Sequence, residues 1–600
     1  MLLFLCLAAP AQEPIRYTVR FPRPHTHYLE VAASVPAGRP SVELFMAVWT
    51  PGSYLVREYS RNVEDFQART PEGRPLAWTK TRKNRWRIES GGAPRIEVSY
   101  RVYARELSVQ GNWVDAEFAM LNGAPNFVTL AGAEKRPYEV KLELPPAWRK
   151  SISGMHSGGA PHTYVAADFD ELLDCPIYAG NAPIHEFEVD GKKHHLVNEG
   201  EGPMWDGPAS ARDAARIVAE YNRQWGGLPY DRYVFFNLLL ESGGGLEHKN
   251  STWLGASRWA YGNTQDPPES APGSGEARSR TPNRLSWLGL VSHEYFHVWN
   301  VKRLRPAELG PFDYENEVYT RSLWLAEGVT SYYGPLALRR AGLSARDQYL
   351  RSLSGTIAQL QTAPGRLAAP VESLSYDAWI KLYRPNENST NTGISYYTKG
   401  AVIGFLLDAK IRKASNGARS LDDVMKDAFA RYGGARGYTP GEFRALAGAE
   451  FGPWFRKALE TTEELDYSEA LDWYGLRFKT EPQRPGAAPR ILTGIATSAA
   501  SGRIRVTGLR RGTPGYDSGL NVDDEILAVD GYRVRPEQWP ARLAGYKPGE
   551  TVEVLVARRD RLMNIALAIV ADQPASWSLE VRPDATEEQK AHRKAWLREE

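Results

Sequence analysis

The residues with the clearest chemistry lie in the stretch Ser292–Asn300, which contains the pattern H-E-x-x-H. Its members are His293, Glu294 and His297. Positions i and i+4 of an α-helix lie on one face, one turn apart, so the two imidazoles can bind the same metal ion. Apolar flanking residues favour a helix that is at least half buried, and Pro306 marks where it must have stopped. The pattern therefore predicts a metal site.

A match to so short a pattern needs independent support. The histidine and acidic content of the chain predicts about 0.02 chance matches. A third ligand, a helical context and a substrate site would each strengthen the prediction.

Glu327, in the apolar helical stretch Trp324-Leu-Ala-Glu-Gly, is the strongest candidate for a third ligand. A carboxylate on an apolar face is costly to bury without a partner, and coordination to zinc removes that cost. A solvated helical glutamate is the equally weighted alternative. Two imidazoles and one carboxylate leave one coordination position open, as catalytic zinc sites do. Glu294, about 100° around the helix from His293, can then accept a proton from zinc-bound water and pass it to the leaving amine.

Several domains must position these residues, because 600 residues are too many for one hydrophobic core. Residues 12–180 show period-2 runs separated by Pro, Gly and Asn, which predicts an antiparallel β-sandwich. Residues 181–478 add mostly helical patterns behind a small sheet, with a polar loop at about 262 to 284. Residues 485–572 read as β again. A charged tail, 573–600, follows, and its stretch Glu587–Glu600 predicts a solvated helix. The fold class is therefore multidomain α+β.

Composition excludes some partners. A net charge of +2 gives no electrostatic argument for binding nucleic acid or a membrane surface. Beyond the N-terminus, no run reaches the 18 apolar residues needed for a membrane span. Residues 1–11 are apolar and end in Ala9-Pro10-Ala11, which resembles a secretory signal. We therefore expect an exported bacterial protein, periplasmic or secreted, although an ordinary apolar N-terminus would look the same. Cys175 would then stand alone, which excludes an intrachain disulfide in the mature chain.

Three motifs together resemble the gluzincin peptidases: H-E-Y-F-H at 293–297, W-L-A-E-G at 324–328, and Tyr396-Tyr397-Thr398-Lys399-Gly400. With G-G-L-E-H at 244–248, W-T-P-G-S-Y at 49–54 and the C-terminal module, the chain resembles the M61, or glycyl aminopeptidase, family. This resemblance implies a thermolysin-like catalytic domain with one zinc ion per chain. It implies His293, His297 and Glu327 as zinc ligands and Glu294 as general base. Tyr397 would donate its hydroxyl to the oxyanion, with Tyr396 as a less favoured substitute.

The G-G-L-E-H stretch resembles the G-A-M-E-N exopeptidase motif. Gly244 and Gly245 would let an edge strand approach the substrate backbone, and Glu247 would bind the free α-ammonium group. A solvated loop glutamate is the alternative. This chain has His248 where the motif has Asn, and Asn250 is a possible substitute.

Two further segments have weaker assignments. Residues 485–572 resemble a PDZ domain, with Leu492-Thr-Gly-Ile495 in place of its carboxylate-binding loop, so a peptide C-terminus is a possible partner. This module could equally be a lid or an interdomain brace. The W-T-P-G-S-Y turn is best interpreted as a structural corner, since Pro-Gly pairs usually serve geometry.

The sequence thus predicts a zinc-dependent aminopeptidase that hydrolyses the N-terminal bond of peptides, favouring Gly or Ala by family resemblance. Its substrates would be peptides with a free N-terminus. A zinc endopeptidase, in which Glu247 recognises no amine, is the first alternative. The second alternative is a periplasmic peptide-binding scaffold that uses the PDZ-like module, with the metal site idle.

Overall fold

The computed structural model describes residues 12–240, 243–261, 283–479, 491–499, 502–572 and 576–599. The predicted signal segment 1–11 lies outside the described residues, as does nearly all of the predicted polar loop at 262 to 284. The described chain divides into two compact units. The first holds residues up to 261 with 283–318 and 432–437, and the second holds 319–431 and residues from 438 onward.

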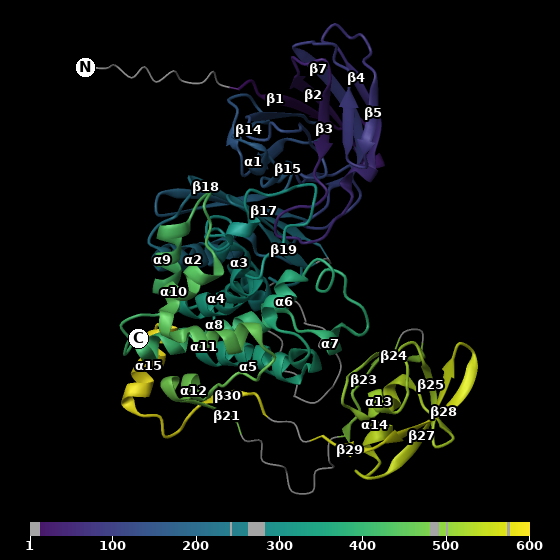
Figure 1. Ribbon diagram of the computed structural model, residues 1–600, viewed down its shortest axis with the longest axis vertical. Helices are drawn as coiled ribbons and strands as arrows, with labels where there is room; N and C mark the ends of the chain where they lie inside the picture. Colours follow the sequence, from purple (N-terminus) through teal and green to yellow (C-terminus); the bar gives the residue numbers. More distant parts are fainter. Residues whose placement is uncertain are drawn as a thin grey trace. The chain divides into compact units, whose positions relative to one another are not determined.

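The first unit begins with a β domain, drawn in purple and blue in Figure 1. Alternation builds its core: in β1 the buried residues are Ile15, Tyr17 and Val19, and the residues between them face outward. A seven-stranded sheet has the order β13-β14-β11-β1-β2-β7-β4, and two four-stranded sheets have the orders β10-β3-β6-β5 and β12-β15-β9-β8. The expected antiparallel β-sandwich architecture is confirmed, with one parallel pair, β1 with β11.

The elements of this domain are β1 (Ile15–Arg20), β2 (Tyr28–Pro36), β3 (Val42–Met46), β4 (Val63–Arg69), β5 (Trp78–Arg82), β6 (Arg85–Ile88), β7 (Arg95–Tyr103), β8 (Trp113–Val114), β9 (Ala119–Leu121), β10 (Val128–Leu130), β11 (Tyr138–Glu143), β12 (Lys150–Ser153), β13 (His156–Ser157), β14 (Thr163–Ala166), α1 (Phe169–Leu173) and β15 (Ile177–Gly180).

A five-stranded sheet completes the first unit, in the order β16-β17-β18-β20-β19. Its central strands β17, β18 and β20 are parallel, and β19 pairs antiparallel with β20 at the edge. The strands are β16 (Ile184–Val189), β17 (Lys192–Glu199), β18 (Arg232–Leu239), β19 (Gly244–Glu247) and β20 (Ser251–Ala256), and the helices are α2 (Gly207–Trp225) and α3 (Arg284–Phe296). The G-G-L-E stretch therefore forms the edge strand of this sheet.

The second unit is mainly helical, in teal and green in Figure 1. Its main helical elements are the π-helical turn η4 (Trp324–Val329), α4 (Thr330–Arg340), α5 (Arg346–Thr362), α6 (Val371–Tyr376), α7 (Ser389–Thr392), α8 (Tyr396–Ala414), α9 (Leu421–Tyr432), α10 (Pro440–Gly448), α11 (Gly452–Phe455) and α12 (Ser468–Tyr474). Helix α8 is buried over most of its length. It touches η4 backbone to backbone, since a Cβ added at Gly400 would lie 2.6 Å from the Trp324 carbonyl oxygen. Only glycine permits so close a crossing.

The C-terminal β module also belongs to the second unit and has a core of its own, which includes Val506, Val529, Val554 and Leu567. Its sheet runs β23-β24-β25-β27-β28, with β26 beside β25, and β22 pairs with β29. The elements are β22 (Ile491–Leu492), β23 (Ile495–Ser498), β24 (Ile504–Leu509), α13 (Pro514–Asp517), β25 (Glu525–Val529), β26 (Tyr532–Arg533), α14 (Trp539–Ala544), β27 (Thr551–Arg558), β28 (Arg561–Ala568) and β29 (Val570–Ala571). The predicted β module is present, and its identity as a PDZ domain stays a prediction.

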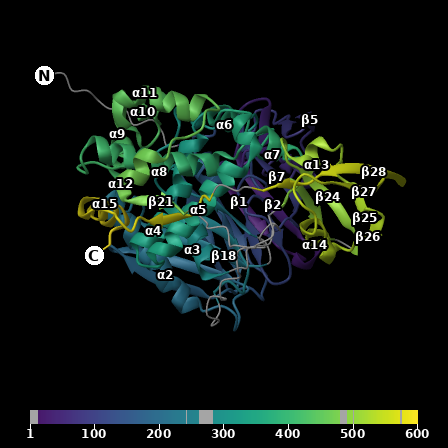
Figure 2. The ribbon, with the colours of Figure 1, turned by 90° about the horizontal axis from the view of Figure 1, so that it is seen from below.

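The predicted helix of the charged tail is present, but it is not solvated on all sides. Strand β30 (Leu579–Val581) pairs with β21 (Leu476–Phe478), and α15 (Glu587–Leu597) then lies beside α12, as Figures 1 and 2 both show. Trp596 is fully buried, stacks on Tyr474 at 4.1 Å between ring centroids, and donates its indole N–H to the Tyr332 hydroxyl at 2.8 Å. The burial of Trp596 and Leu597 near the end of α15 thus holds the helix against the protein despite its charged face.

No helix among the described residues combines the length and the apolarity that crossing a membrane requires.

Candidate functional site

Helix α3 carries the H-E-x-x-H pattern on a rigid support. The side chain of Asn283 caps its N-terminus by accepting a hydrogen bond from the Ser286 amide at 2.8 Å. Further along, the Trp287 indole donates to Asn237 of β18 at 3.0 Å, and Ser292 pairs with the Tyr221 hydroxyl of α2 at 2.9 Å. The helix is therefore held against the sheet and against α2 on the turns before the motif.

The two imidazoles lie at the C-terminal end of α3, where His297 is the capping residue. The carbonyl oxygen of Asn300 lies 2.6 Å from His297 Nδ1. A carbonyl can only accept, so Nδ1 carries the proton and Nε2 keeps its lone pair. That Nε2 lies 3.2 Å from Nε2 of His293. The hydrogen bond from Nδ1 to the Asn300 carbonyl thus fixes the tautomer of His297, in the manner usual for metal-binding histidines.

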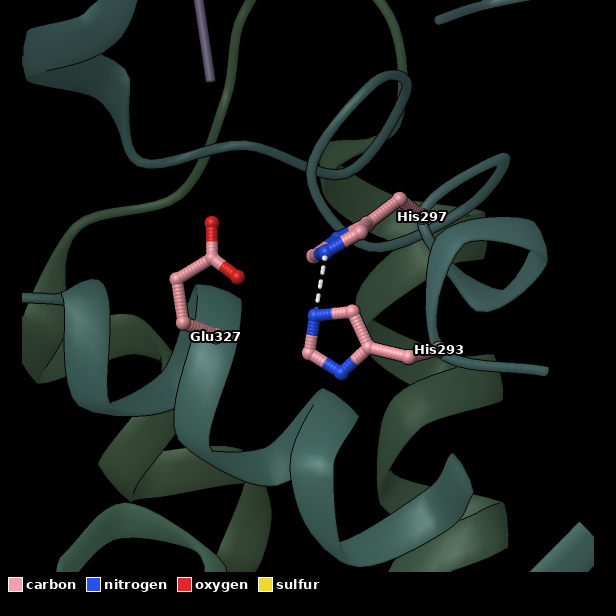
Figure 3. Close-up of side chains that lie close together, drawn as sticks. All are labelled: His293, His297 and Glu327. Atoms are coloured by element: carbon pink, nitrogen blue, oxygen red, sulfur yellow. Dashed lines mark hydrogen bonds between the residues drawn. The ribbon is translucent and has the colours of Figure 1, made fainter. Parts of the chain in front are cut away.

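Glu327 completes a group of three possible ligands. The ligand atoms of His293, His297 and Glu327 all lie within 4.8 Å of one another, and Figure 3 shows the Glu327 carboxylate directed toward the imidazoles. Glu327 is buried and lies in the π-helical turn η4, a geometry frequent at functional sites. Two imidazole nitrogens and one carboxylate oxygen are the donors of a catalytic zinc site, so the residues fit this metal.

A second buried cluster brings Glu247 to the same helix. The ligand atoms of Glu247, Glu294 and His297 lie within 4.8 Å of one another, and all three side chains are buried. Glu247 reaches this place as the last residue of the edge strand β19, opposite Thr252 of β20. Two carboxylates buried so close together repel each other unless a cation lies beside them. The cluster therefore favours the binding of a positively charged group.

The two glycines before Glu247 have different surroundings. A Cβ added at Gly245 would collide with the carboxyl group of Glu294, so this glycine leaves room for the proposed base. Gly244 has φ +114°, and nothing lies within 4 Å of where its Cβ would be. The structure therefore assigns Gly245 a contact that the sequence did not indicate, and substrate binding by both glycines stays a prediction.

A largely buried ion pair lies near Glu247. Lys302 Nζ is 2.5 Å from Oδ1 of Asp174, and the Lys249 amide donates to Oδ2 at 2.7 Å. Burial opposes the charged form of Asp174, but the Lys302 ammonium and the His248 imidazole outweigh it and hold the pKa of this carboxyl well below its usual range. Burial lowers the pKa of Lys302, and the charges of Asp174 and Glu247 overcome this effect and raise it. A positive charge thus stands near Glu247.

His248 and Asn250 make polar contacts in the same region as this ion pair. His248 is buried with Nδ1 3.4 Å from Oδ1 of Asp174, and its burial is the main reason that the pKa of the imidazole falls below its ordinary value. The Oδ1 atom of Asn250 accepts a hydrogen bond from Nη2 of Arg303 at 2.8 Å. The sequence did not indicate a role for Asp174 or Lys302, because neither belongs to a recognisable motif.

The two tyrosines of the Y-Y-T-K-G motif begin helix α8. The side chain of Ser395 caps the helix by accepting from the Tyr397 amide at 3.2 Å. The rings of Tyr396 and Tyr397 stack with centroids 4.9 Å apart, with Tyr396 buried and Tyr397 half-buried. The contact of Gly400 with η4 places this end of α8 beside the turn that carries Glu327. The oxyanion role of Tyr397 stays a prediction.

Comparison with known proteins gives two family matches. The Peptidase M61 N-terminal domain matches residues 16–181, and the M61 glycyl aminopeptidase domain matches residues 286–403. The crystal structure of an aminopeptidase N family protein from Idiomarina loihiensis is similar over 97% of this chain and 100% of its own, with a TM-score of 0.87 and 30% identity.

More distant structures resemble the chain weakly. An M1 zinc metallopeptidase from Deinococcus radiodurans has 12% identity and a TM-score of 0.47, over 76% of this chain and 95% of its own. A search of the curated proteins finds no match.

Proposed function

The chain belongs to the M61 family of peptidases, and we propose that it is a zinc-dependent aminopeptidase that removes small N-terminal residues, glycine or alanine, from peptides. The observation that carries the proposal is the buried cluster of Glu247, Glu294 and His297. It joins a candidate anchor for an amine to a candidate base at one place.

His293, His297 and Glu327 would hold the zinc ion. When bound, zinc supplies a Lewis acid that polarises a carbonyl and lowers the pKa of a water molecule to about 7. The tautomer set by Asn300 supports this role, because it leaves the His297 Nε2 lone pair facing His293.

Glu294 is the proposed general base. It takes the proton from the attacking water and returns it to the nitrogen of the leaving amine. It follows His293 in the chain and points about 100° around the helix from it, which supports a role beside the ligands. Tyr397 would donate its hydroxyl to the oxygen that becomes negatively charged during the attack.

Glu247 is the proposed anchor for the α-ammonium group of the substrate. In any peptide the α-nitrogen and the carbonyl carbon of the first residue are two bonds apart, about 2.5 Å. An anchor whose carboxylate lies within 4.8 Å of the ligand atoms of Glu294 and His297 is therefore suited to the first peptide bond. A peptide bond farther along the chain would leave Glu247 without its cation.

The decisive comparison uses glycine and alanine anilides against their N-acetylated equivalents, together with metal analysis of the purified protein. An aminopeptidase of this kind cleaves the anilides that have a free amine, and it carries about one zinc ion per chain. Strong cleavage of the blocked substrates would establish the endopeptidase alternative. If the purified protein contains zinc but hydrolyses neither kind of substrate, the scaffold alternative is favoured.

The C-terminal β module supports a second proposal, that it binds a peptide C-terminus. Strand β23 lies at one end of the sheet order and pairs with β24, so its other side can receive an added strand. The preceding turn has Gly494 at φ +68°, and its carbonyl accepts from the Arg510 amide at 2.9 Å. Titration with a peptide library ending in free carboxylates, and with the same peptides amidated, tests this. Equal binding of both forms, or of neither, would reject it.

A further inference from the structure

The turn Thr50–Ser53 of the N-terminal β domain lies against the carboxylate of Glu247. A Cβ added at Gly52 would be 2.6 Å from Oε1 and 2.7 Å from Oε2 of Glu247, and 2.7 Å from Cδ1 of Leu246. Carbon and oxygen atoms do not approach so closely without a bond. The glycine backbone itself therefore closes on the carboxylate, although 195 positions separate Gly52 from Glu247.

The turn is rigid. Its ends pair with each other, and the Ser53 amide donates to the Thr50 carbonyl at 3.1 Å. The Ser53 hydroxyl accepts from Nη2 of Arg57 at 2.7 Å, and both Thr50 and Ser53 are buried. Gly52 itself has φ +90°, a conformation that favours glycine.

Trp49 anchors the turn from behind. Its side chain is fully buried, and its indole N–H donates to the Asp313 carbonyl at 2.8 Å. Its ring lies 5.8 Å from that of Phe312 and 6.2 Å from that of Tyr314, between centroids. The Val48 amide also donates to the Tyr314 carbonyl at 2.8 Å. The turn therefore cannot retreat without breaking a packed aromatic cluster.

We propose that Gly52 is a positioning residue for substrate recognition: the turn Thr50–Ser53 is a wall of the amine subsite and holds the Glu247 carboxylate in place. The N-terminal β domain thereby takes part in selecting the substrate. The inference rests on the proposed role of Glu247 as anchor of the α-ammonium group. A carboxylate that is held in one orientation and shielded from water binds an ammonium group more strongly than a mobile, hydrated one.

The positive φ of Gly52 favours glycine at this position even without the contact to Glu247. A second glycine separates this backbone effect from the collision with the carboxylate. Gly73 has φ +87°, almost the value of Gly52, and nothing lies within 4 Å of where its Cβ would be. Gly73→Ala introduces the same strain as Gly52→Ala without the collision. It is the matched control.

The test compares Gly52→Ala with Gly73→Ala in hydrolysis of glycine anilide. We expect KM to rise about tenfold in Gly52→Ala, with a smaller change in kcat, and Gly73→Ala to stay within about twofold of the wild type. A binding measurement removes any dependence on turnover. In a Glu294→Gln background, the Kd of glycylglycine measured by calorimetry should rise about tenfold with Gly52→Ala and stay unchanged with Gly73→Ala.

Variants at Glu247 separate the inference from the proposed function. Glu247→Asp shortens the side chain by one methylene and leaves room for the new Cβ, so it should recover part of the loss in Gly52→Ala, or its folding if the single variant is unstable. In Glu247→Ala, adding Gly52→Ala should have no further effect on KM beyond that of Gly73→Ala. Equal losses in both backgrounds, or identical behaviour of the two glycine variants, would overturn the inference while the proposed function stands. Unchanged preference for free amines in Glu247→Ala would overturn the anchor role and the inference with it.

Discussion

The metal end and the amine end of the site are built in different ways. His293, Glu294 and His297 lie within about one turn of a single helix, and α3 sets their spacing by its own geometry. Glu247 lies on an edge strand, packs against Gly52 from another domain, and lies near the ion pair of Asp174 and Lys302. The proposed base and two of the three candidate metal ligands depend on local structure, whereas Glu327 and the amine end depend on long-range packing.

The comparison teaches how the two properties of such an enzyme are separated. In the proposed mechanism, the helix supplies water activation, which serves any peptide bond. The strand and the turn would supply a carboxylate that can measure the distance from a free amine. Changes at the metal end should abolish the reaction for all substrates, whereas changes at the amine end should alter which substrates are cleaved.

The largest effect is expected at the base. Glu294→Gln keeps the shape of the side chain but cannot accept a proton, so kcat should fall about 10²- to 10⁴-fold while the zinc content stays that of the wild type. Steady-state kinetics and metal analysis measure the two quantities. Glu308→Gln, at an exposed position beyond the motif, is the control. Wild-type turnover in Glu294→Gln would remove this residue from the mechanism.

A smaller effect is expected at the proposed oxyanion donor. Tyr397→Phe should lower kcat about 10²-fold, because one hydrogen bond to the developing negative charge is lost. Tyr396→Phe, in the ring that stacks on Tyr397, is a matched control and should retain most activity. The loss in Tyr397→Phe should be the same for every substrate that the enzyme cleaves, which would group Tyr397 with the metal end. A larger loss of kcat in Tyr396→Phe than in Tyr397→Phe would assign the oxyanion role to Tyr396.

The smallest effect concerns the support that lies under α3. His194 is fully buried, and its Nε2 lies 2.8 Å from the Tyr230 hydroxyl, which contacts the hydroxyl of Tyr295 in the motif helix. Burial lowers the pKa of His194 to about 4. The unfolded chain therefore binds this proton first, and stability should be fully present above pH 6.5 and fall by up to about 3 kcal/mol as pH drops through 4.

Urea unfolding of the wild type and of His194→Phe, at pH 7 and at pH 4.5, measures this contribution. The variant should lose less stability than the wild type between the two values, because its ring cannot be protonated. Equal losses would show that His194 does not govern the acid sensitivity of this region. At pH 7, His194→Phe should keep the preference of the wild type for glycine anilide over N-acetylglycine anilide.

Much of the architecture follows from local patterns. Period-2 alternation predicted the β domain, apolar helical patterns predicted the helical region, and the fold class is confirmed. The i, i+4 spacing of His293 and His297 placed both imidazoles together without knowledge of the tertiary fold. Glu327 was predicted because a carboxylate on an apolar stretch needs a partner, and its ligand atom lies within 4.8 Å of those of the two histidines. Its role as a zinc ligand stays a prediction.

The remaining features depend on which distant segments meet. Nothing in the turn at Gly52 indicates a contact with Glu247, and the Pro-Gly pair suggested a structural corner. The turn is such a corner, yet it also lies against the carboxylate. The burial of Trp596 was missed for the same reason, since charge dominates the composition of its helix and one aromatic residue decides its packing.

The most direct test of the central claim is the selectivity ratio of Glu247→Ala. For the wild type, we expect kcat/KM for glycine anilide to exceed that for N-acetylglycine anilide by at least roughly 10²-fold, the value of a buried carboxylate–ammonium pair. In Glu247→Ala this ratio should fall at least about tenfold, with zinc content and any activity on the blocked substrate unchanged. An unchanged ratio would contradict the claim that Glu247 makes the enzyme recognise a free N-terminus.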